Sequence, residues 1–129
     1  MPSAAIGPDW WFPQSVASGD PLPDAVLLWT RVTPDSGIVA PITLDWEIAT
    51  DSAFTNVVNN GSGVAATNHD FTLTVDATGL SPHTVYYYRF QAPGGEFSRR
   101  GRTKTAPDGN VDSMKIAVLS CSSIYSGFF

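Results

Sequence analysis

The chain has 129 residues, of which 43% are hydrophobic and 15% charged, so it is too apolar for a disordered protein and fits one domain of ordinary size. Seven basic residues against twelve acidic ones give a formal net charge of -5, which argues against a binding surface for nucleic acid or an anionic membrane. The single cysteine, Cys121, excludes an internal disulfide bond, and no apolar run approaches the length of a membrane span.

Residues 1–13 have neither the basic start nor the long apolar core of a secretory signal, so we expect them to form an N-terminal arm. The arm carries three adjacent aromatic residues, Trp10, Trp11 and Phe12. A chain end rarely carries three aromatic side chains without burying them. We therefore expect them to pack on the body of this domain or on a second domain; a carbohydrate-binding platform is the alternative.

The next segments are typical of strands and turns. Residues 14–24 are rich in Ser, Gly, Pro and Asp, which predicts a short edge strand followed by turns, with Asp20 as a turn former. Residues 25–32 are almost continuously apolar, which predicts a strand covered on both faces. Residues 42–49 alternate between apolar and polar side chains, which predicts a strand with one buried face.

A shorter strand is expected over residues 54–58, followed by a turn over residues 59–63, where Asn and Gly are concentrated. The glycosylation pattern that begins at Asn60 is better explained by this turn. Strands are predicted again over residues 70–75 and 84–90, which both alternate or carry aromatic side chains on one face.

The last part of this pattern is a hairpin turn at residues 93–95 and a return strand over residues 97–105. About seven strands with turns between them predict an all-β fold, an antiparallel sandwich of the immunoglobulin or fibronectin type III kind over residues 14–107. A linker over residues 108–112 follows. The expected core consists of Val26, Leu28 or Trp29, Leu44, Trp46, Ile48, Phe54, Phe71, Leu73, Val75, Leu80, Tyr86, Tyr88 and Phe90.

The segment Gly79-Leu-Ser-Pro82, followed by Tyr86, resembles the tyrosine corner of fibronectin type III domains. In that corner the tyrosine hydroxyl bonds to the backbone where the chain crosses between sheets. Trp29 resembles the core tryptophan of the same fold. The residues to which we assign a structural role are Trp29, Trp46, Leu80, Pro82, Tyr86 and Tyr88.

Two groups of titratable residues lie outside this pattern. The basic residues gather once, in Arg99, Arg100, Arg102 and Lys104. Basic side chains discourage pairing at an exposed strand edge, so we interpret this cluster as an edge strand, with an anion or partner site as the alternative. His69 and His83 lie at predicted strand edges, where solvated or lightly hydrogen-bonded histidines are the simplest interpretation.

The tail, residues 113–129, does not fit the sandwich. Residues 116–119 form a continuous apolar run, which is typical of a strand buried on both faces in a parallel sheet. Polar residues follow it, as they do where strands of an α/β sheet deliver ligands at the carboxyl edge. Cys121 lies at this point, and two interpretations stay open: a small buried apolar residue, or a metal ligand or nucleophile.

Four motifs in this order are similar to the start of the PhoD-like alkaline phosphatases: Ala17-Ser-Gly-Asp-Pro21, Gly79-Leu-Ser-Pro82, Tyr86-Tyr-Tyr-Arg-Phe90 and Ser120-Cys121. The resemblance implies an N-terminal sandwich packed on a catalytic α/β metallophosphatase domain, and hydrolysis of phosphate monoesters or diesters. It also implies that Cys121 is an iron ligand with calcium ions alongside. Residues 113–129 would be the first strand and following loop of the catalytic domain. A secreted, periplasmic or cell-surface location is implied as well.

The family's other metal ligands are Asp, Asn, His and Tyr residues on later strands, and these have no counterpart here. We therefore expect no stable binding of iron or calcium by this chain and no phosphatase activity from it alone, because one ligand is not a metal site. Its expected partner is the catalytic domain, with no role for nucleic acid or a membrane span. The alternative is a free-standing fibronectin-type binding module, which would have no need of the tail.

Overall fold

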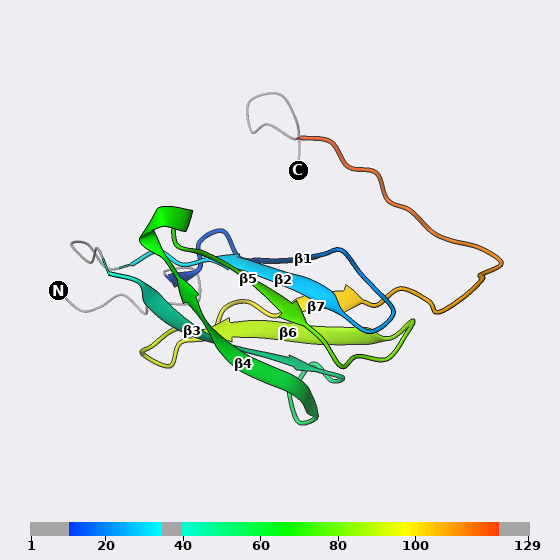
Figure 1. Ribbon diagram of the computed structural model, residues 1–129, viewed down its shortest axis with the longest axis horizontal. Helices are drawn as coiled ribbons and strands as arrows, with labels where there is room; N and C mark the ends of the chain where they lie inside the picture. The colour runs from blue at the N-terminus through cyan, green and yellow to red at the C-terminus, as the bar shows by residue number, and fades with distance from the viewer. Residues whose placement is uncertain (1–10, 35–39, 122–129) are drawn as a thin grey trace.

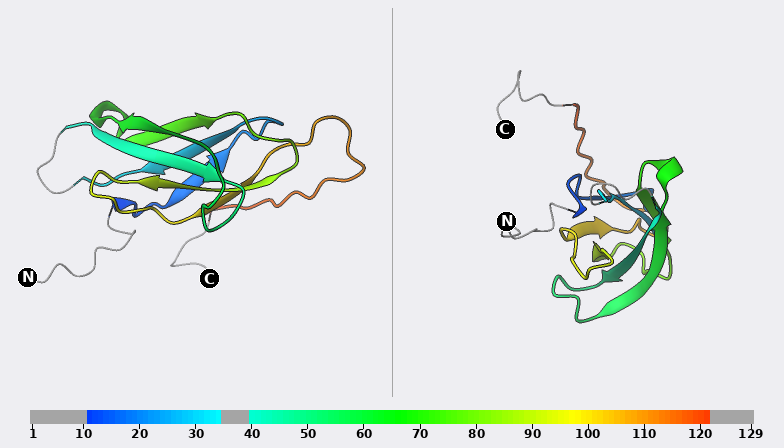
Figure 2. Two further views of the ribbon diagram at one scale, coloured as in Figure 1. Left: turned by 90° about the horizontal axis from the view of Figure 1, so that it is seen from below. Right: turned by 90° about the vertical axis from the view of Figure 1, so that its left-hand side faces the viewer.

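The computed structural model describes residues 11–34 and 40–121, which form two antiparallel sheets packed face to face (Figures 1 and 2). One sheet has the order β1-β2-β5 and the other the order β4-β3-β6-β7. The strands are β1 (Val16–Gly19), β2 (Val26–Arg31), β3 (Ile42–Ala49), β4 (Val57–Ala65), β5 (Thr72–Ala77), β6 (Val85–Gln91) and β7 (Gly101–Lys104). A single 3-10 turn, η1 (Thr67–His69), connects β4 to β5. The predicted two-sheet sandwich is confirmed.

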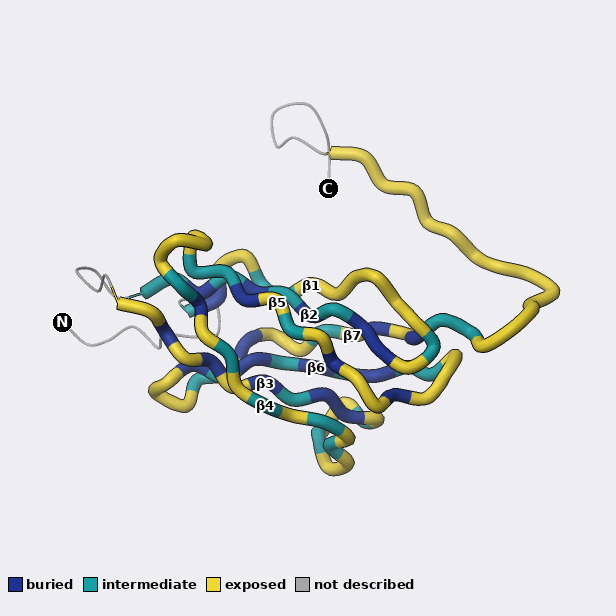
Figure 3. The backbone as a smooth tube through the Cα atoms, in the orientation of Figure 1, coloured by how far each residue is buried: buried dark blue, intermediate teal, exposed yellow. Residues whose placement is uncertain are grey.

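Period-two alternation places one face of β2, β3 and β6 in the core. On β3 the side chains of Ile42, Leu44, Trp46 and Ile48 are buried, while Thr43 and Asp45 point to solvent. β6 repeats this pattern with Tyr86, Tyr88 and Phe90 inward. Figure 3 shows the resulting alternation of buried and exposed positions along both sheets. The buried set lies between the sheets, as expected of a sandwich.

Small residues and cross-sheet contacts close the sandwich along both sides. The Ser18 hydroxyl of β1 donates a hydrogen bond to Thr103 Oγ1 of β7 at 2.9 Å. On the other side β4 lies against β5, where a Cβ on Gly63 would stand 2.7 Å from Leu73 Cδ1. Glycine at position 63 therefore permits the close approach of the two sheets.

The N-terminal aromatic segment belongs to the core in part. Phe12, with 1% exposed, and Phe90 are the largest fully buried side chains among the described residues, and Trp11 packs against the same cluster. The backbone fixes this position, because Ser15 N–H donates to Phe12 O and Thr33 N–H donates to Trp11 O. The predicted packing of Trp11 and Phe12 on the body of the domain is confirmed, and Trp10 lies outside the described residues.

The second and fourth strands differ from the sequence prediction. β2 is fully buried on one face only: Leu28 is buried, whereas Trp29 is half-buried on the outer face and is not part of the core. The predicted turn at residues 59–63 is wrong, since β4 runs straight through it and pairs with β3 over its whole length. Asn60 is therefore an exposed strand residue, so a turn does not explain its glycosylation pattern.

The strand predicted over residues 54–58 exists, but it begins only at Val57 and continues to Ala65 as β4. Phe54 lies in the turn before β4, at a φ of 55°, and is outside the core cluster. Phe71 and Val75 are partly buried and pack against the core from β5 and the residue before it. The return strand is shorter than predicted, because only residues 101–104 pair continuously with β6 and Phe97 forms an isolated bridge to Gln91.

The tail leaves the sandwich after Pro107 and follows an extended path along it (Figure 1). Its described residues, up to Cys121, include no strand, so the strand expected around the apolar run at residues 116–119 is not formed in this structure. The apolar side chains of this segment are exposed to solvent: 68% for Met114, 75% for Ile116, 89% for Val118 and 91% for Leu119.

Candidate functional site

Cys121 was the one candidate metal ligand, and it lies at the far end of the described tail. Its side chain is exposed, so it is not a buried apolar residue of the sandwich. The hydroxyl of the preceding residue, Ser120, donates a hydrogen bond to the Cys121 sulfur at 4.0 Å. The structure therefore places this thiol in solvent and away from the two sheets.

The donor set at Cys121 does not by itself fit a metal. Within residues 11–34 and 40–121, no group of three or more His, Cys, Asp or Glu side chains could hold an ion. Iron and zinc sites in proteins need several converging donors, and a single thiolate supplies one.

The point where the tail leaves the sandwich is held by a dense set of hydrogen bonds, which we call the exit cluster (residues 22–24, 80–84 and 105–106). The Ser81 N–H donates to the Tyr86 hydroxyl oxygen at 2.8 Å. Leu80 N–H donates to Asp24 O at 2.9 Å, and the Leu80 side chain is buried. Tyr86 thus bonds to the backbone of the turn before its own strand, while Pro82 is exposed on that turn.

Thr105 is the central residue of the exit cluster. Its hydroxyl donates to Ser81 O at 2.6 Å and accepts from Thr84 N–H at 2.9 Å, and only 3% of the residue is exposed. The next residue, Ala106, donates its N–H to Leu22 O and accepts from His83 N–H. The chain is therefore fixed up to residue 106, directly before the tail begins.

A hollow lies against this exit cluster on the tail side. It is lined by residues from the turn around His83, from the end of β7 and from the first part of the tail, including Val111 and Met114. His83 itself is exposed, at a φ of 50°, and its backbone N–H is the group that bonds to Ala106. His69 is likewise exposed, in η1. The structure places neither histidine beside Cys121.

The basic cluster follows the outer edge of one sheet. β7 is the edge strand beside β6, as the basic residues predicted, and Arg102 and Lys104 are exposed on it. Arg100 lies just before this strand, where its guanidinium donates to Ser52 O at 2.9 Å and stands 5.9 Å from the Tyr87 ring centroid. Asp20, predicted to form a turn, directly follows β1 at a φ of 45°.

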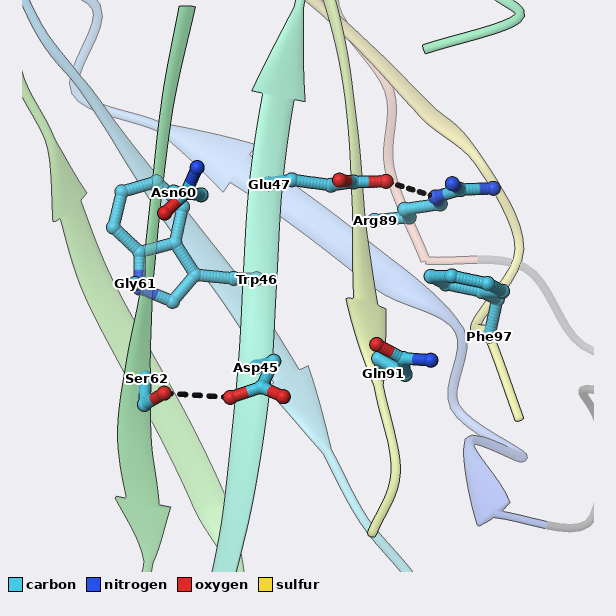
Figure 4. Close-up of a pocket in the computed structure, with 9 residues that line it drawn as sticks. All are labelled: Asp45, Trp46, Glu47, Asn60, Gly61, Ser62, Arg89, Gln91 and Phe97. Carbon is cyan, nitrogen blue, oxygen red and sulfur yellow. Dashed lines mark hydrogen bonds and ion pairs between the residues drawn. The ribbon is translucent and has the colours of Figure 1, made fainter. Parts of the chain in front are cut away.

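The outer face of the four-stranded sheet carries a polar groove, which local sequence reasoning missed. Strand register sets two rows of outward side chains across β4, β3 and β6: Ser62, Asp45 and Gln91 in one row, and Asn60, Glu47 and Arg89 in the next. Phe97 borders the rows on one side (Figure 4). The groove has a cavity volume of about 260 Å³.

Two interactions fix the groove. Ser62 Oγ donates to Asp45 Oδ1 at 2.5 Å, and Arg89 Nε donates to Glu47 Oε1 at 2.5 Å (Figure 4). The Arg89 guanidinium is also stacked between two aromatic rings, 4.0 Å from the Phe54 centroid and 3.6 Å from the Phe97 centroid. Cation–π stacking on both faces leaves this side chain little freedom.

Comparison with known proteins gives one consistent result. A family model described as "PhoD-like phosphatase, N-terminal domain" matches residues 3–107. The chain is 42% identical over 125 residues to alkaline phosphatase D of Bacillus subtilis (strain 168), covering 92% of this chain and 21% of that protein. A solved structure titled "Structure of PhoD" superimposes with a TM-score of 0.75 at 41% identity, over 79% of this chain and 21% of that one. Among the described residues no helix is long and apolar enough to span a bilayer.

Proposed function

The chain belongs to the family of PhoD-like phosphatase N-terminal domains, and we propose that it serves as the accessory domain that braces the catalytic domain of a phosphoesterase. The observation that carries this proposal is the 42% identity to alkaline phosphatase D over 92% of the chain. The chain spans only about a fifth of the length of that relative, so hydrolysis of phosphate monoesters or diesters would reside mainly in sequence that lies outside it.

The contrast between the exit cluster and the tail supports this role. Thr105 and Ala106 are fixed by backbone hydrogen bonds, and the apolar run beyond them is exposed. A run of Ile, Ala, Val and Leu exposed to water favours burial against another surface. The catalytic domain would provide that surface and receive the run as a buried strand, so the sandwich would be joined to it through a rigid end.

We assign to Cys121 the role of one ligand of an active-site iron in the assembled enzyme. A bound iron with neighbouring calcium ions would polarise the phosphate ester and orient the attacking oxygen. The contribution of this chain is the thiolate, carried at the end of the apolar run, and the other ligands would come from the catalytic domain. The family resemblance also leads us to propose export to the periplasm, cell surface or medium.

Two measurements test the proposal. The purified 129-residue chain, assayed with a phosphate monoester and a diester in the presence of iron and calcium, should show no more turnover than its Cys121→Ala variant. In the full-length enzyme, Cys121→Ala should remove phosphatase activity and lower the iron content by elemental analysis, whereas the neighbouring Ser120→Ala should retain iron. Metal-dependent turnover by the isolated chain, or full iron content in the Cys121→Ala enzyme, would contradict it.

A further inference from the structure

We propose that the polar groove on the outer face of the four-stranded sheet is a binding site for a neutral saccharide. The groove is separate from the tail and from Cys121, since it is built on β3, β4 and β6. It does not depend on the phosphatase role of the parent enzyme.

The dimensions of the groove suit a small ring. Outward residues on one strand are about 6.6 Å apart and neighbouring strands about 4.8 Å apart, so six side chains on three strands cover roughly 10 Å by 7 Å. The volume of about 260 Å³ is below the range of about 300–1,000 Å³ that is typical of drug-sized ligands. One or two sugar rings are of this size.

The chemistry of the floor matches hydroxyl groups. Carboxylates accept hydrogen bonds, a guanidinium donates them, and amides do both, which is the mixture that a polyol requires. The Asn60 side chain has no hydrogen-bond partner among the described residues, and the Gln91 amide nitrogen donates only to Gly95 O within that same part of the chain. Both amides therefore keep unused hydrogen-bonding capacity at the groove.

An exposed aromatic ring forms the wall. Phe97 is 37% exposed although one of its faces stacks on Arg89. An aromatic ring beside convergent polar groups offers an apolar surface to the C–H face of a sugar. The outer face of a sheet is usually polar because it faces water. Here, however, the Arg89 and Glu47 side chains are only 26% and 25% exposed, so the charged pair is part of a preformed concave surface.

The charges of the groove argue against other ligands. Two carboxylates and one guanidinium give a net charge of -1, which disfavours phosphate and other anions. One of the two carboxylates is already paired with Arg89, and the described residues offer no three-donor cluster for a cation. The polar floor also disfavours an apolar peptide. A neutral ligand rich in hydroxyl groups is the class that remains.

The test is a titration of the isotope-labelled 129-residue chain, followed by amide resonances. The probes are glucose, N-acetylglucosamine and cellobiose, with inorganic phosphate and calcium as contrasts. We expect at least one saccharide to cause saturable shifts, with millimolar affinity, confined to residues 45–47, 60–62, 89–91 and 97.

Two variants and a control make the result decisive. Asn60→Ala and Gln91→Ala should each lower the affinity for that saccharide roughly five- to tenfold, because each removes one hydrogen-bonding side chain. Thr74→Ala, an exposed change on the outer face of the other sheet, should leave the affinity unchanged. Absence of saturable shifts with every saccharide, larger shifts with phosphate or calcium, or unchanged affinity in both groove variants would overturn the proposal.

Discussion

Ile48 on β3 and Ile116 in the tail are the same residue type, each in a segment that the sequence predicts as a strand, yet Ile48 is fully buried whereas Ile116 is 75% exposed. β3 is hydrogen-bonded on both sides, to β4 and to β6, and its inward side chains meet the opposite sheet. The described part of the tail has no paired strand on either side. A single extended segment is not stable as a strand, even when its side chains are apolar. A strand is stabilised by contacts and hydrogen bonds with neighbouring strands, which this segment lacks in the described residues.

The boundary between the two regions is therefore set by hydrogen bonding rather than by hydrophobicity. The exit cluster holds the backbone as far as Ala106, and a second apolar run, residues 116–119, lies beyond it after a polar linker. If the sandwich is complete without the tail, a core substitution and a tail substitution of similar size should differ sharply in effect.

The largest effect is expected for Phe12→Ala. Phe12 is a fully buried phenylalanine, so its truncation should lower the free energy of unfolding by about 3–5 kcal/mol through lost burial and a residual cavity. Leu119→Ala, in the tail, is the control and should change the free energy of unfolding by less than about 0.5 kcal/mol. Urea unfolding followed by tryptophan fluorescence measures both. Equal losses in the two variants would show that the tail is part of the folded core.

A smaller effect is expected at the exit cluster. Tyr86→Phe removes the hydroxyl that accepts from Ser81 N–H and should cost about 0.5–1.5 kcal/mol. The neighbouring Tyr87 points to the outer face of β6, so Tyr87→Phe should remain within about 0.5 kcal/mol of the parent chain. The same urea experiment compares the two variants. If Tyr87→Phe lowered the free energy of unfolding as much as Tyr86→Phe, the hydrogen bond of the tyrosine corner would have no special role in stability.

The third effect is a change of pH dependence. Asp51 accepts hydrogen bonds from the Thr55 hydroxyl and backbone N–H and from Asn56 N–H, and these bonds lower its pKa from 3.8 to about 2. A lowered pKa in the folded state means that the stabilisation is present above pH 3.8 and is lost as the pH falls towards 2.

Asp51→Asn should therefore flatten the fall in melting temperature over this pH window, while lowering the melting temperature at neutral pH. Thermal unfolding at several pH values checks both points. The turn that Asp51 holds lies between β3 and β4, within the sandwich. A melting profile that keeps the same slope in Asp51→Asn would assign the acid sensitivity to other carboxylates.

The strands that could be predicted from the sequence are those in which one buried face alternates with one solvated face. Residues 42–49 were predicted with the same bounds as β3, because the period-two pattern there is complete. The core residues Trp46, Leu80, Tyr86 and Tyr88 likewise lie in the buried cluster.

The wrong predictions have a common physical cause, which is packing between segments that lie far apart in the chain. Residues 59–63 have the composition of a turn, but a Cβ on Gly61 would stand 3.0 Å from the Trp46 ring, so the glycines make room for core side chains while β4 pairs with β3. Phe54 was predicted to be buried in the core, but it stacks on Arg89 at the surface.

The groove could not be predicted for a related reason. Its outward residues alternate correctly on three strands, but their juxtaposition depends on the spatial order β4-β3-β6, which skips β5. A local sequence pattern shows on which face of a sheet a side chain lies. It does not show which strand is the neighbour of the strand that carries this side chain. The role of Cys121 likewise rests on family resemblance alone.

The smallest effect on stability, and the sharpest test of the boundary, is expected from deleting residues 113–129. Because the apolar residues in the described part of this segment are exposed, their removal should leave the free energy of unfolding within about 0.5 kcal/mol of the full chain. It should also raise solubility, since exposed apolar patches promote association.

A longer deletion, of residues 105–129, is the control, because it also removes the Thr105 hydroxyl that bonds to Ser81 O and Thr84 N–H. Each buried polar group left without its partner costs about 1–3 kcal/mol, so this variant should be clearly less stable. Size-exclusion chromatography and urea unfolding compare the two deletions. If removal of residues 113–129 alone destabilised the sandwich as much as the longer deletion, the tail would be an integral part of this domain, and its proposed place in a catalytic domain would fail.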